Sequence, residues 1–321
     1  MTNKYIGAFS SDNREIYKAD IYKVMSLPND GVIHFRYKKK YVDNDILHMQ
    51  PEKYKENKVI IYLTQGNTNA TSSENENLTN ISIREAEIVK CFYSTDTDVF
   101  HIYLKLSNFV DAKIIKSLSG DELPPYKFLS KISITKNKDT WVSRVKQVKN
   151  SFATINFFFI KGIYLNEKEI KPLEKNKELL SYKLKKGNTY NIKMSLGNPN
   201  ETKSKIKIIE NNNDTIINHI NPIENSAQYD DISIPIYIKS TPSCKQSTFL
   251  SIQPFIDKNE FSEEYKLNIE LELCLSIRRA LIFGFLSTIA SMAITPSSNY
   301  IISLPCIFIA SAGLFYFFGK K

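Results

Sequence analysis

Residues 265–276 read YKLNIELELCLS, and apolar and polar side chains alternate through this stretch. A period of two is the pattern of a β-strand with one buried face. Only Ile277 separates the stretch from Arg278. The sequence therefore predicts a strand that runs almost directly into the segment after it.

Shorter strand-like segments, separated by Gly, Pro and Asn turns, precede this one back to about residue 151. Short strands at this spacing are typical of a β-sandwich. We predict a mainly β chain with an immunoglobulin-like β-sandwich over residues 151–276. The strands expected in it are 152–160, 189–196, 203–209, 215–220, 232–240, 248–255 and 265–276.

The tail is the most apolar part of the chain, with no charged residue from Ala280 to Phe318. Two apolar runs, 280–295 and 300–318, would span about 24 and 28 Å as helices, close to the thickness of a bilayer core. The residues PSSN between them predict a tight turn. We predict a two-helix transmembrane hairpin over residues 277–321; the alternative is a buried helical hairpin of a soluble protein.

Basic residues flank both outer ends of the hairpin, whereas its turn carries no charge. The positive-inside rule then places both ends in the cytoplasm, so we expect a two-pass protein of the bacterial inner membrane with both termini cytoplasmic. The expected membrane-interface anchors are Arg278, Arg279, Lys320 and Lys321.

One face of the first apolar run is small and hydroxylated. Such a face either packs against another helix or lines a water path. Two helices cannot enclose a pore, so a channel requires a homo-oligomer, for which we take a tetramer as the working number. The candidate pore-lining residues are Gly284, Ser287, Thr288, Ser291 and Thr295.

The first part of the chain looks like a separate cytosolic domain, β-rich and of α+β type, over residues 1–120. Its expected elements are strands at 31–41, 58–63, 81–91 and 99–106 and one helix over 107–118. Residues 121–150 read as a basic linker. The wider segment 121–200 carries 16 Lys/Arg against 7 Asp/Glu, an excess equal to the net charge of the whole chain, +9.

Motifs for catalysis are missing from the sequence. The histidines lack metal-ligand spacing, and no nucleophile elbow, zinc-protease or phosphate-loop motif is present. Asp43 and Asp45 form a D-x-D that is more simply a solvated turn than a magnesium site, and His101 reads as an ordinary strand residue. We expect no enzyme activity, no cofactor and no metal.

Basic residues interleaved with aromatic ones are the stronger signal. FRYKKKY at 35–41 predicts a strand with a cationic face, and the linker adds further cations around the single tryptophan. Phosphates pair with such charges and bases stack on such rings, so an anionic nucleotide or oligonucleotide is the expected ligand. The alternatives are attraction to anionic lipid and plain solvation. The candidate ligand-binding residues are Arg36, Tyr37, Lys38, Lys39, Lys40, Lys136, Lys138, Trp141, Arg144 and Lys146.

A cytosolic β-rich region joined at SIRR, residues 276–279, to a tail of the ISLPCIFIASAGLFYFF type resembles the membrane effectors of bacterial antiphage systems. Among these it is most similar to the HalA family of Hailong effectors. The resemblance covers the architecture and no diagnostic motif. It implies an oligomeric channel-type protein, a DNA-oligomer ligand that holds the channel closed, and a partner nucleotidyltransferase that makes the ligand.

The sequence thus favours an oligomeric inner-membrane effector, of ion-channel or pore-forming type, gated by a single-stranded DNA oligomer or a cyclic or oligomeric nucleotide. One alternative is a membrane-anchored binding or scaffold protein with no pore. Another is a membrane-tethered nuclease-type enzyme that uses Asp43 and Asp45.

Overall fold

The computed structural model describes residues 3–66, 68, 78–118, 127–152, 155–173, 179–199, 204–210, 215–217, 222–225, 227–239, 246–257, 260–274 and 285. This part of the chain is mainly β, as predicted, and its strands form three sheets. All of the predicted hairpin except Phe285, including its pore-lining and anchor residues, lies outside the described residues.

The first sheet closes on itself. Its strand order is β2-β5-β4-β3-β1-β6, and β6 also pairs with β5, so five strands form a barrel while β2 extends the sheet from β5 as an edge strand. β1 and β3 are parallel, and the other pairs are antiparallel. The strands are β1 (Asn3–Ser11), β2 (Val32–Lys38), β3 (Lys58–Gln65), β4 (Thr79–Ser94), β5 (Val99–Ser117) and β6 (Leu129–Lys138).

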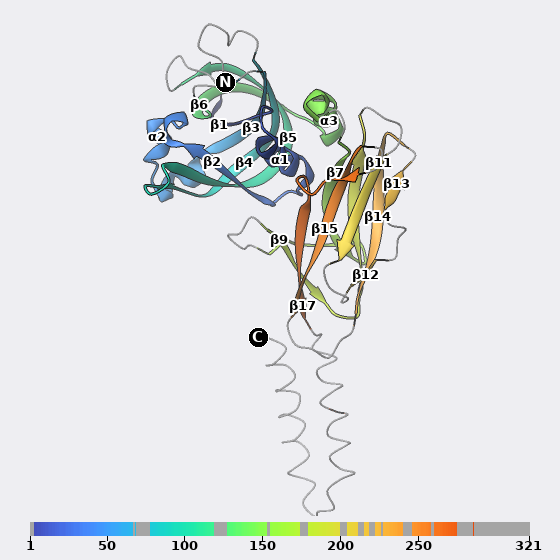
Figure 1. Cartoon of the computed structure of the whole chain (residues 1–321). Helices are drawn as coiled ribbons and strands as arrows, with labels where there is room; N and C mark the ends of the chain where they lie inside the picture. Colours follow the sequence, from blue (N-terminus) through green and yellow to red (C-terminus); the bar gives the residue numbers. More distant parts are fainter. Residues whose placement is uncertain are drawn as a thin grey trace, which may run out of the picture.

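Helices are few in the described chain and lie around this barrel (Figure 1). The longest connects β1 to β2, and an amphipathic one follows β6, capped by the Thr140 hydroxyl, which accepts from Ser143 N. The helices are α1 (Glu15–Ser26), α2 (Asn44–Leu47), α3 (Trp141–Val148) and three 3₁₀ turns at Lys39–Tyr41, Pro51–Glu56 and Lys149–Phe152.

The inside of the barrel is a small apolar cluster. Phe9 of β1 stacks on Tyr62 of β3 with ring centroids 4.9 Å apart, and Ile132 and Ile134 of β6 complete the packing. Ser82 stands where β5 leaves β4 to pair with β6, and its hydroxyl accepts from Ala112 N and donates to Val110 O. That side chain satisfies backbone groups where the two strands separate.

Two further sheets make up the second body, called here the two-sheet body. One has the order β12-β14-β10-β7-β8 and the other β13-β11-β15-β17-β9, with β16 beside β15; β9 and β17 are parallel. The buried side chains of both sheets belong to one core cluster. The strands are β7 (Phe157–Leu165), β8 (Lys168–Ile170), β9 (Leu180–Lys185), β10 (Thr189–Gly197), β11 (Ser204–Glu210), β12 (Thr215–Ile217), β13 (Ile223–Asn225), β14 (Tyr229–Ile238), β15 (Gln246–Asp257), β16 (Glu260–Phe261) and β17 (Leu267–Cys274).

Two segments differ from the sequence-based expectation. The helix predicted over residues 107–118 is wrong, because these residues are the second half of β5 and pair with β6. β6 itself falls within residues 121–150, which we had read as a linker, and it is a strand of the barrel wall. The spacing of the apolar residues fits both the helical period of 3.6 and the strand period of two, at positions 109, 110, 112, 114 and 115. Pairing with β6 selects the extended form.

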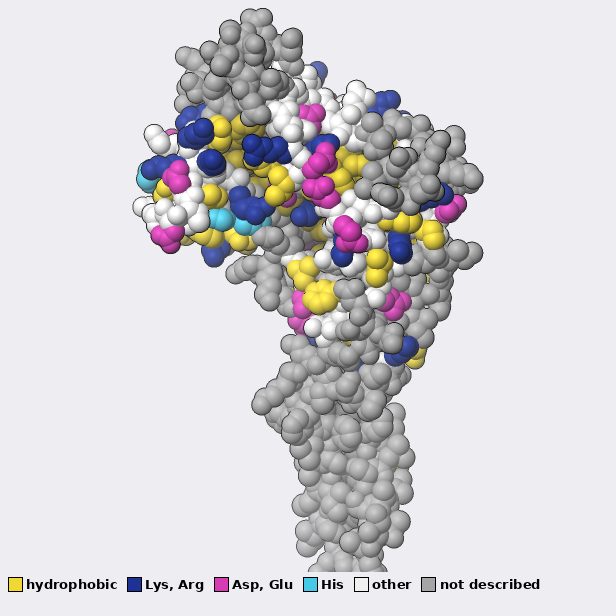
Figure 2. Space-filling model, in the orientation of Figure 1, with side chains coloured by type: hydrophobic (Ala, Val, Ile, Leu, Met, Phe, Trp, Pro, Cys, Tyr) yellow, Lys and Arg dark blue, Asp and Glu magenta, His cyan; other side chains and the backbone are white. Residues whose placement is uncertain are grey.

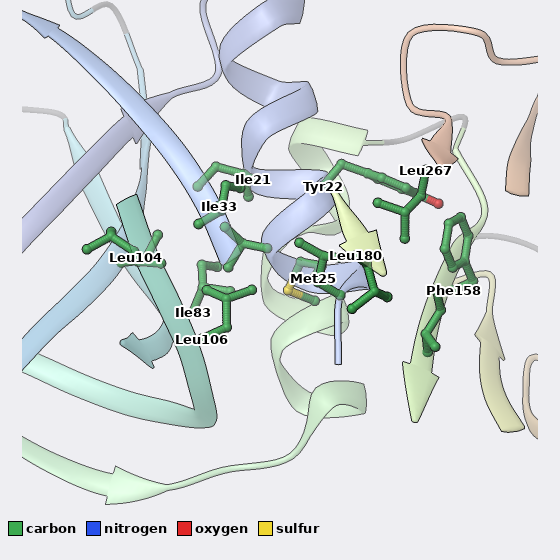
Figure 3. Close-up of a cluster of buried hydrophobic side chains, with 14 of the residues drawn as sticks. Ile21, Tyr22, Met25, Ile33, Ile83, Leu104, Leu106, Phe158, Leu180 and Leu267 are labelled. Carbon is green, nitrogen blue, oxygen red and sulfur yellow. The ribbon is translucent and has the colours of Figure 1, made fainter. Parts of the chain in front are cut away.

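Helix α1 lies between the barrel and the two-sheet body and joins their cores. Figure 3 shows Ile21 and Met25 of α1 beside Ile33 and Leu106 of the barrel on one side, and Leu180 of β9 on the other. Figure 3 also labels other members of the same core cluster, which are Tyr22, Ile83, Leu104, Phe158 and Leu267. The face of the barrel sheet that carries Ile33 and Leu104 is therefore connected, through α1, to Leu267 at the start of β17 by one continuous core.

Aromatic rings reinforce this junction around Tyr22. Its ring stacks on Phe157 at 5.5 Å and meets Tyr265 edge-on at 5.1 Å, and its hydroxyl donates to Asn156 O at 2.6 Å. Burial raises the pKa of Tyr22 well above its ordinary value, so the phenol stays a protonated donor. The single tryptophan, Trp141, joins α1 to the two-sheet body, because its indole N–H donates to Met25 O at 3.1 Å and its ring centroid lies 6.2 Å from that of Phe159.

Tyr22→Phe should lower the free energy of unfolding by about 1–2 kcal/mol, because it leaves a buried carbonyl without its donor while keeping the ring. Urea unfolding of the full-length protein measures this loss. Fluorescence is a suitable signal because Trp141, the single tryptophan, contacts α1 at the junction. Tyr17→Phe is the matched control, since Tyr17 lies on the exposed side of α1. Equal stability of Tyr22→Phe and the parent protein would contradict the assigned hydrogen bond.

Candidate functional site

Strand β2 presents its basic residues on one side, as its sequence alternation predicts. Arg36 and Lys38 are exposed, whereas Phe35 and Tyr37 are buried on the opposite side. The strand ends at Lys38, and Lys39 and Lys40 continue in a 3₁₀ turn rather than in the strand. The cationic face of the strand is therefore shorter than predicted.

The pairing of β2, β5 and β4 brings four flat rings together on the outer face of the sheet. In one row Phe92, His101 and Arg36 are neighbours across the three strands, and in the next row Tyr103 lies between Lys90 and His34. The four rings, Phe92, His101, His34 and Tyr103, are called here the platform.

The rings of the platform are stacked nearly parallel. Phe92 and His101 have centroids 4.8 Å apart with 10° between planes, His101 and His34 are 5.1 Å apart, and His34 and Tyr103 are 4.2 Å apart at 2°. His34 Nε2 and His101 Nδ1 are 2.9 Å apart, so one imidazole donates to the other. This hydrogen bond fixes both imidazole planes, and Phe92 remains 39% exposed. The rings cover part of one another's faces, and the exposed part of the platform, chiefly Phe92, is suited to stacking with another flat ring.

Cations border the platform. Lys90 Nζ lies 4.8 Å from the Phe92 ring centroid, and Lys39 Nζ lies 5.4 Å from that of Tyr93. Lys105, one row beyond Tyr103, is held 3.2 Å from Asp30. Figure 2 shows Lys and Arg side chains gathered on the barrel with His and apolar side chains among them. The surface can thus offer both ring faces and positive charge to one ligand.

Two of the predicted ligand-binding residues are buried and have partners within the protein, which fits a structural role rather than a ligand contact. Trp141 is 6% exposed at the junction, and Arg144 is 1% exposed. The Arg144 guanidinium pairs with Asp139 and with Asp111 at 3.6 Å, and it donates to Ser82 O at 3.1 Å. Trp141 packs α3 against Phe159 and Tyr229 of the two-sheet body, and Arg144 joins α3 to Ser82 and Asp111 of the barrel.

Three further predicted cations lie apart from the platform. Lys136 pairs with Glu85 at 2.8 Å and lies over the Tyr5 ring at 5.1 Å, at one end of the barrel interior. Lys138 is exposed on the second half of the β5–β6 ladder. Lys146 lies 5.6 Å from the Tyr229 ring on α3. The structure therefore gathers only the β2 part of the predicted cluster into one surface.

Sequence reasoning missed the ring stack. It treated His101 as an ordinary strand residue and did not single out His34, Phe92 or Tyr103. The alternation in FHIYLKL, residues 100–106, does place His101 and Tyr103 on one face. The other two rings join them only through strand pairing, which a single sequence does not specify.

Asp43 and Asp45 have partners that fit a structural role. Asp43 is 4% exposed, and its Oδ2 accepts from Lys131 N at 3.0 Å. Asp45 pairs with Lys131 Nζ at 2.8 Å, and this hydrogen bond lowers the pKa of the Asp45 carboxyl. Across the described ranges, no group of three or more His, Cys, Asp or Glu side chains is placed to hold a metal ion.

Within the described part of the chain, none of the helices has the length and apolarity of a membrane span. The residues predicted to form the hairpin fall almost entirely beyond that part.

Comparison with known proteins gives little beyond the structure itself. No family model matches the chain, and no curated protein matches it. Among solved structures, a family 123 glycoside hydrolase from Clostridium perfringens is similar to 30% of this chain, at 15% identity and a TM-score of 0.20. The matched part is 23% of that enzyme's chain, and a similarity of this size carries no argument about function.

Proposed function

We propose that this protein is an oligomeric inner-membrane effector of bacterial antiphage defence, gated by a single-stranded oligonucleotide that binds to the platform. In this proposal the two-sheet body is an immunoglobulin-like sandwich, and residues 277–321 form a transmembrane hairpin. The hairpins of several protomers line an ion-conducting pore.

The platform is the observation that carries the proposal. Each base that stacks on an aromatic ring contributes about 1–3 kcal/mol to single-strand binding, largely regardless of sequence. Neighbouring cations add an electrostatic attraction that follows the phosphates. Phe92 and Tyr103 supply the ring faces, and Arg36, Lys38 and Lys90 supply the charge.

Packing from the platform to β17 supports a route by which a bound ligand changes the membrane segment. Leu104, on the opposite face of β5 from Tyr103, belongs to the cluster that includes Ile21 and Leu267. β17 begins in this cluster and ends at the far end of the two-sheet body (Figure 1), just before the predicted hairpin. Ligand that prefers one arrangement of the platform would then shift the population of open and closed assemblies.

Binding and flux together test the proposal. Full-length protein in lipid nanodiscs should bind a fluorescent 12-nucleotide single strand, with log K falling by about 0.7 for each unit of log salt per neutralised phosphate. The same protein in liposomes should pass ions at a rate that the oligonucleotide changes. Absence of binding at low salt would overturn the ligand assignment, and a strictly monomeric protein in nanodiscs would overturn the pore.

Replacement of residues 277–321 by an unrelated anchor separates the pore from the alternative of a membrane-anchored binding protein. The proposal expects oligonucleotide binding to persist in this chimera while ligand-dependent flux is lost. Ser291→Phe should block flux without loss of assembly, because a bulky ring would fill the proposed water path. Flux that survives Ser291→Phe would contradict the assigned pore face.

A further inference from the structure

A cavity of about 220 Å³ lies beside the platform, between the first half of α1, the end of β1 and the second half of β2. Its lining is rich in aromatic residues: Tyr17 is exposed and Tyr41 and Phe128 are partly exposed, whereas Phe9, Phe35 and Tyr37 are buried. The cavity is distinct from the platform, because none of the four platform rings lines it.

The cavity walls are fixed by contacts among themselves. The Tyr37 hydroxyl donates to Phe9 O at 3.2 Å, and burial raises the pKa of this phenol, so it remains a donor. Tyr41 and Phe128 meet edge-to-face with centroids 5.3 Å apart. The partly exposed rings of Tyr41 and Phe128 are therefore held in place without a bound molecule having to order them.

Polar groups are also present around the cavity. Asn13 Nδ2 donates to Thr68 Oγ1 at 2.6 Å, and the Ser11 hydroxyl accepts from Asn13 N at 3.1 Å. Asp20 lines the cavity as its acidic residue and lies 3.9 Å from Lys23. An amide, a carboxylate and hydroxyls are the groups that can hydrogen-bond to the edge of a nucleobase.

The cations of the lining, Arg14, Arg36 and Lys38, are all exposed. A ligand whose flat part occupies the aromatic walls would therefore have its anionic part near these three cations. Pockets for drug-sized ligands hold about 300–1,000 Å³, so a cavity below that range suits one ring system.

We infer that this cavity binds one nucleotide, with its base against the aromatic walls and its phosphate at Arg14, Arg36 and Lys38. The inference deepens the proposed function and rests on it, because it assigns one unit of the oligonucleotide to the cavity. Arg36 connects the two places, since it lines the cavity and neighbours His101 across the β2–β5 ladder. The next nucleotides of the same strand would lie over the platform.

Titration of full-length protein in nanodiscs with the four deoxynucleoside monophosphates tests for a single-nucleotide site, and the Tyr41 variants below assign that site to the cavity rather than to the platform. Calorimetry should detect one site per protomer. Lys38→Glu should weaken that binding by about tenfold or more, because it replaces a phosphate partner by a like charge. Lys113→Glu is the matched control and should leave it unchanged, since Lys113 is exposed on β5 outside the cavity.

A pair of variants at Tyr41 checks the aromatic wall. Tyr41→Ala should weaken mononucleotide binding by about fivefold or more, whereas Tyr41→Phe should keep it, because the stacking face is retained. Thermal unfolding of each variant establishes that it is folded before its binding is compared.

The two ligands separate failure of the inference from failure of the proposed function. Oligonucleotide binding without any mononucleotide binding at millimolar concentration would overturn the cavity assignment alone. Mononucleotide binding without oligonucleotide binding would overturn the proposed function and leave the cavity as a nucleotide site. Equal effects of Lys38→Glu and Lys113→Glu would also overturn the cavity assignment.

Discussion

Phe92→Ala combined with Tyr103→Ala should weaken binding of a single-stranded oligonucleotide by about 30-fold or more, because each ring supplies a stacking face worth about 1–3 kcal/mol. Both side chains lie on the outer face of the barrel sheet, and Phe92 is 39% exposed. Their truncation removes little of the core, so the loss should come from the ligand contact. Fluorescence anisotropy with the full-length protein in nanodiscs measures the change.

The matched control for this pair is Ile115→Ala. Ile115 is 51% exposed on the same long strand, but it lies in the half of β5 that pairs with β6 and not under the platform. Its truncation should leave binding within about twofold of the parent protein, as is usual for a surface substitution away from a contact. An equal loss in both proteins would show that general surface apolarity, and not the platform, supports binding.

Salt dependence distinguishes the rings from the charges. The ring variant should keep the salt slope of the parent protein, whereas Arg36→Gln should reduce the slope by about 0.7 as one phosphate contact is lost. If the salt slope of the ring variant fell as much as that of Arg36→Gln, the assignment of stacking to the rings and of phosphate contacts to the cations would be contradicted.

Local alternation was enough to predict much of the two-sheet body. The strands expected at 189–196, 203–209 and 265–276 correspond to β10, β11 and β17 with boundaries shifted by a few residues. Each of these segments has a period of two that its own residues set, and its turn residues mark the ends. Such strands need no knowledge of their partners to be recognised.

Pairing over long separations decided what the sequence could not predict. The sequence of the second half of β5 fits a helix equally well. This segment is extended because it pairs with β6, and that pairing closes the barrel. The platform has the same origin, because Phe92 meets His101 and His34 meets Tyr103 through register. The cations of β2 were visible in the sequence because they lie in one run, whereas the rings come from three strands.

Burial also separates Trp141 and Arg144 from the exposed residues of the predicted ligand-binding set. Both have the residue type of a ligand contact, and a solvated linker would expose them. The amphipathic pattern of α3 turns them inward, where the indole N–H and the guanidinium find Met25 O and the Asp139 carboxylate. Residue type alone does not separate a buried cation with fixed partners from one that binds phosphate.

Arg84→Met should lower the free energy of unfolding by about 3 kcal/mol or more, the largest stability effect that we expect from one substitution. Arg84 is fully buried, and burial lowers the pKa of its guanidinium to about 9, which leaves it charged at neutral pH. It donates to Ser107 O at 2.6 and 2.8 Å, to Leu27 O at 2.6 Å and to Val24 O at 3.1 Å. Methionine fills similar space but leaves these buried carbonyls without a donor, at about 1–3 kcal/mol for each group left unsatisfied.

The position of Arg84 gives its loss a second consequence. Two of its acceptors, Val24 and Leu27, are at the carboxyl end of α1, and its guanidinium lies 4.5 Å from the Phe109 ring and 5.8 Å from the Phe159 ring of β7. Arg84 thus joins the barrel, α1 and the two-sheet body at one point. Arg84→Met should therefore weaken ligand control of flux more than it weakens oligonucleotide binding, because the platform itself is unchanged.

Urea unfolding followed by Trp141 fluorescence measures the stability part, and flux with and without oligonucleotide measures the coupling part. Lys113→Met is the control for removing a cation from an exposed position, and its effect should stay within about 0.5 kcal/mol. Arg84→Lys should recover only part of the loss, since one ammonium cannot reproduce the fork of donors that reaches Ser107, Val24 and Leu27 together. The result that would contradict this prediction is a folded Arg84→Met protein in which the oligonucleotide still controls flux fully. The contact of Arg84 with the barrel, α1 and the two-sheet body would then not be needed to connect the platform to β17.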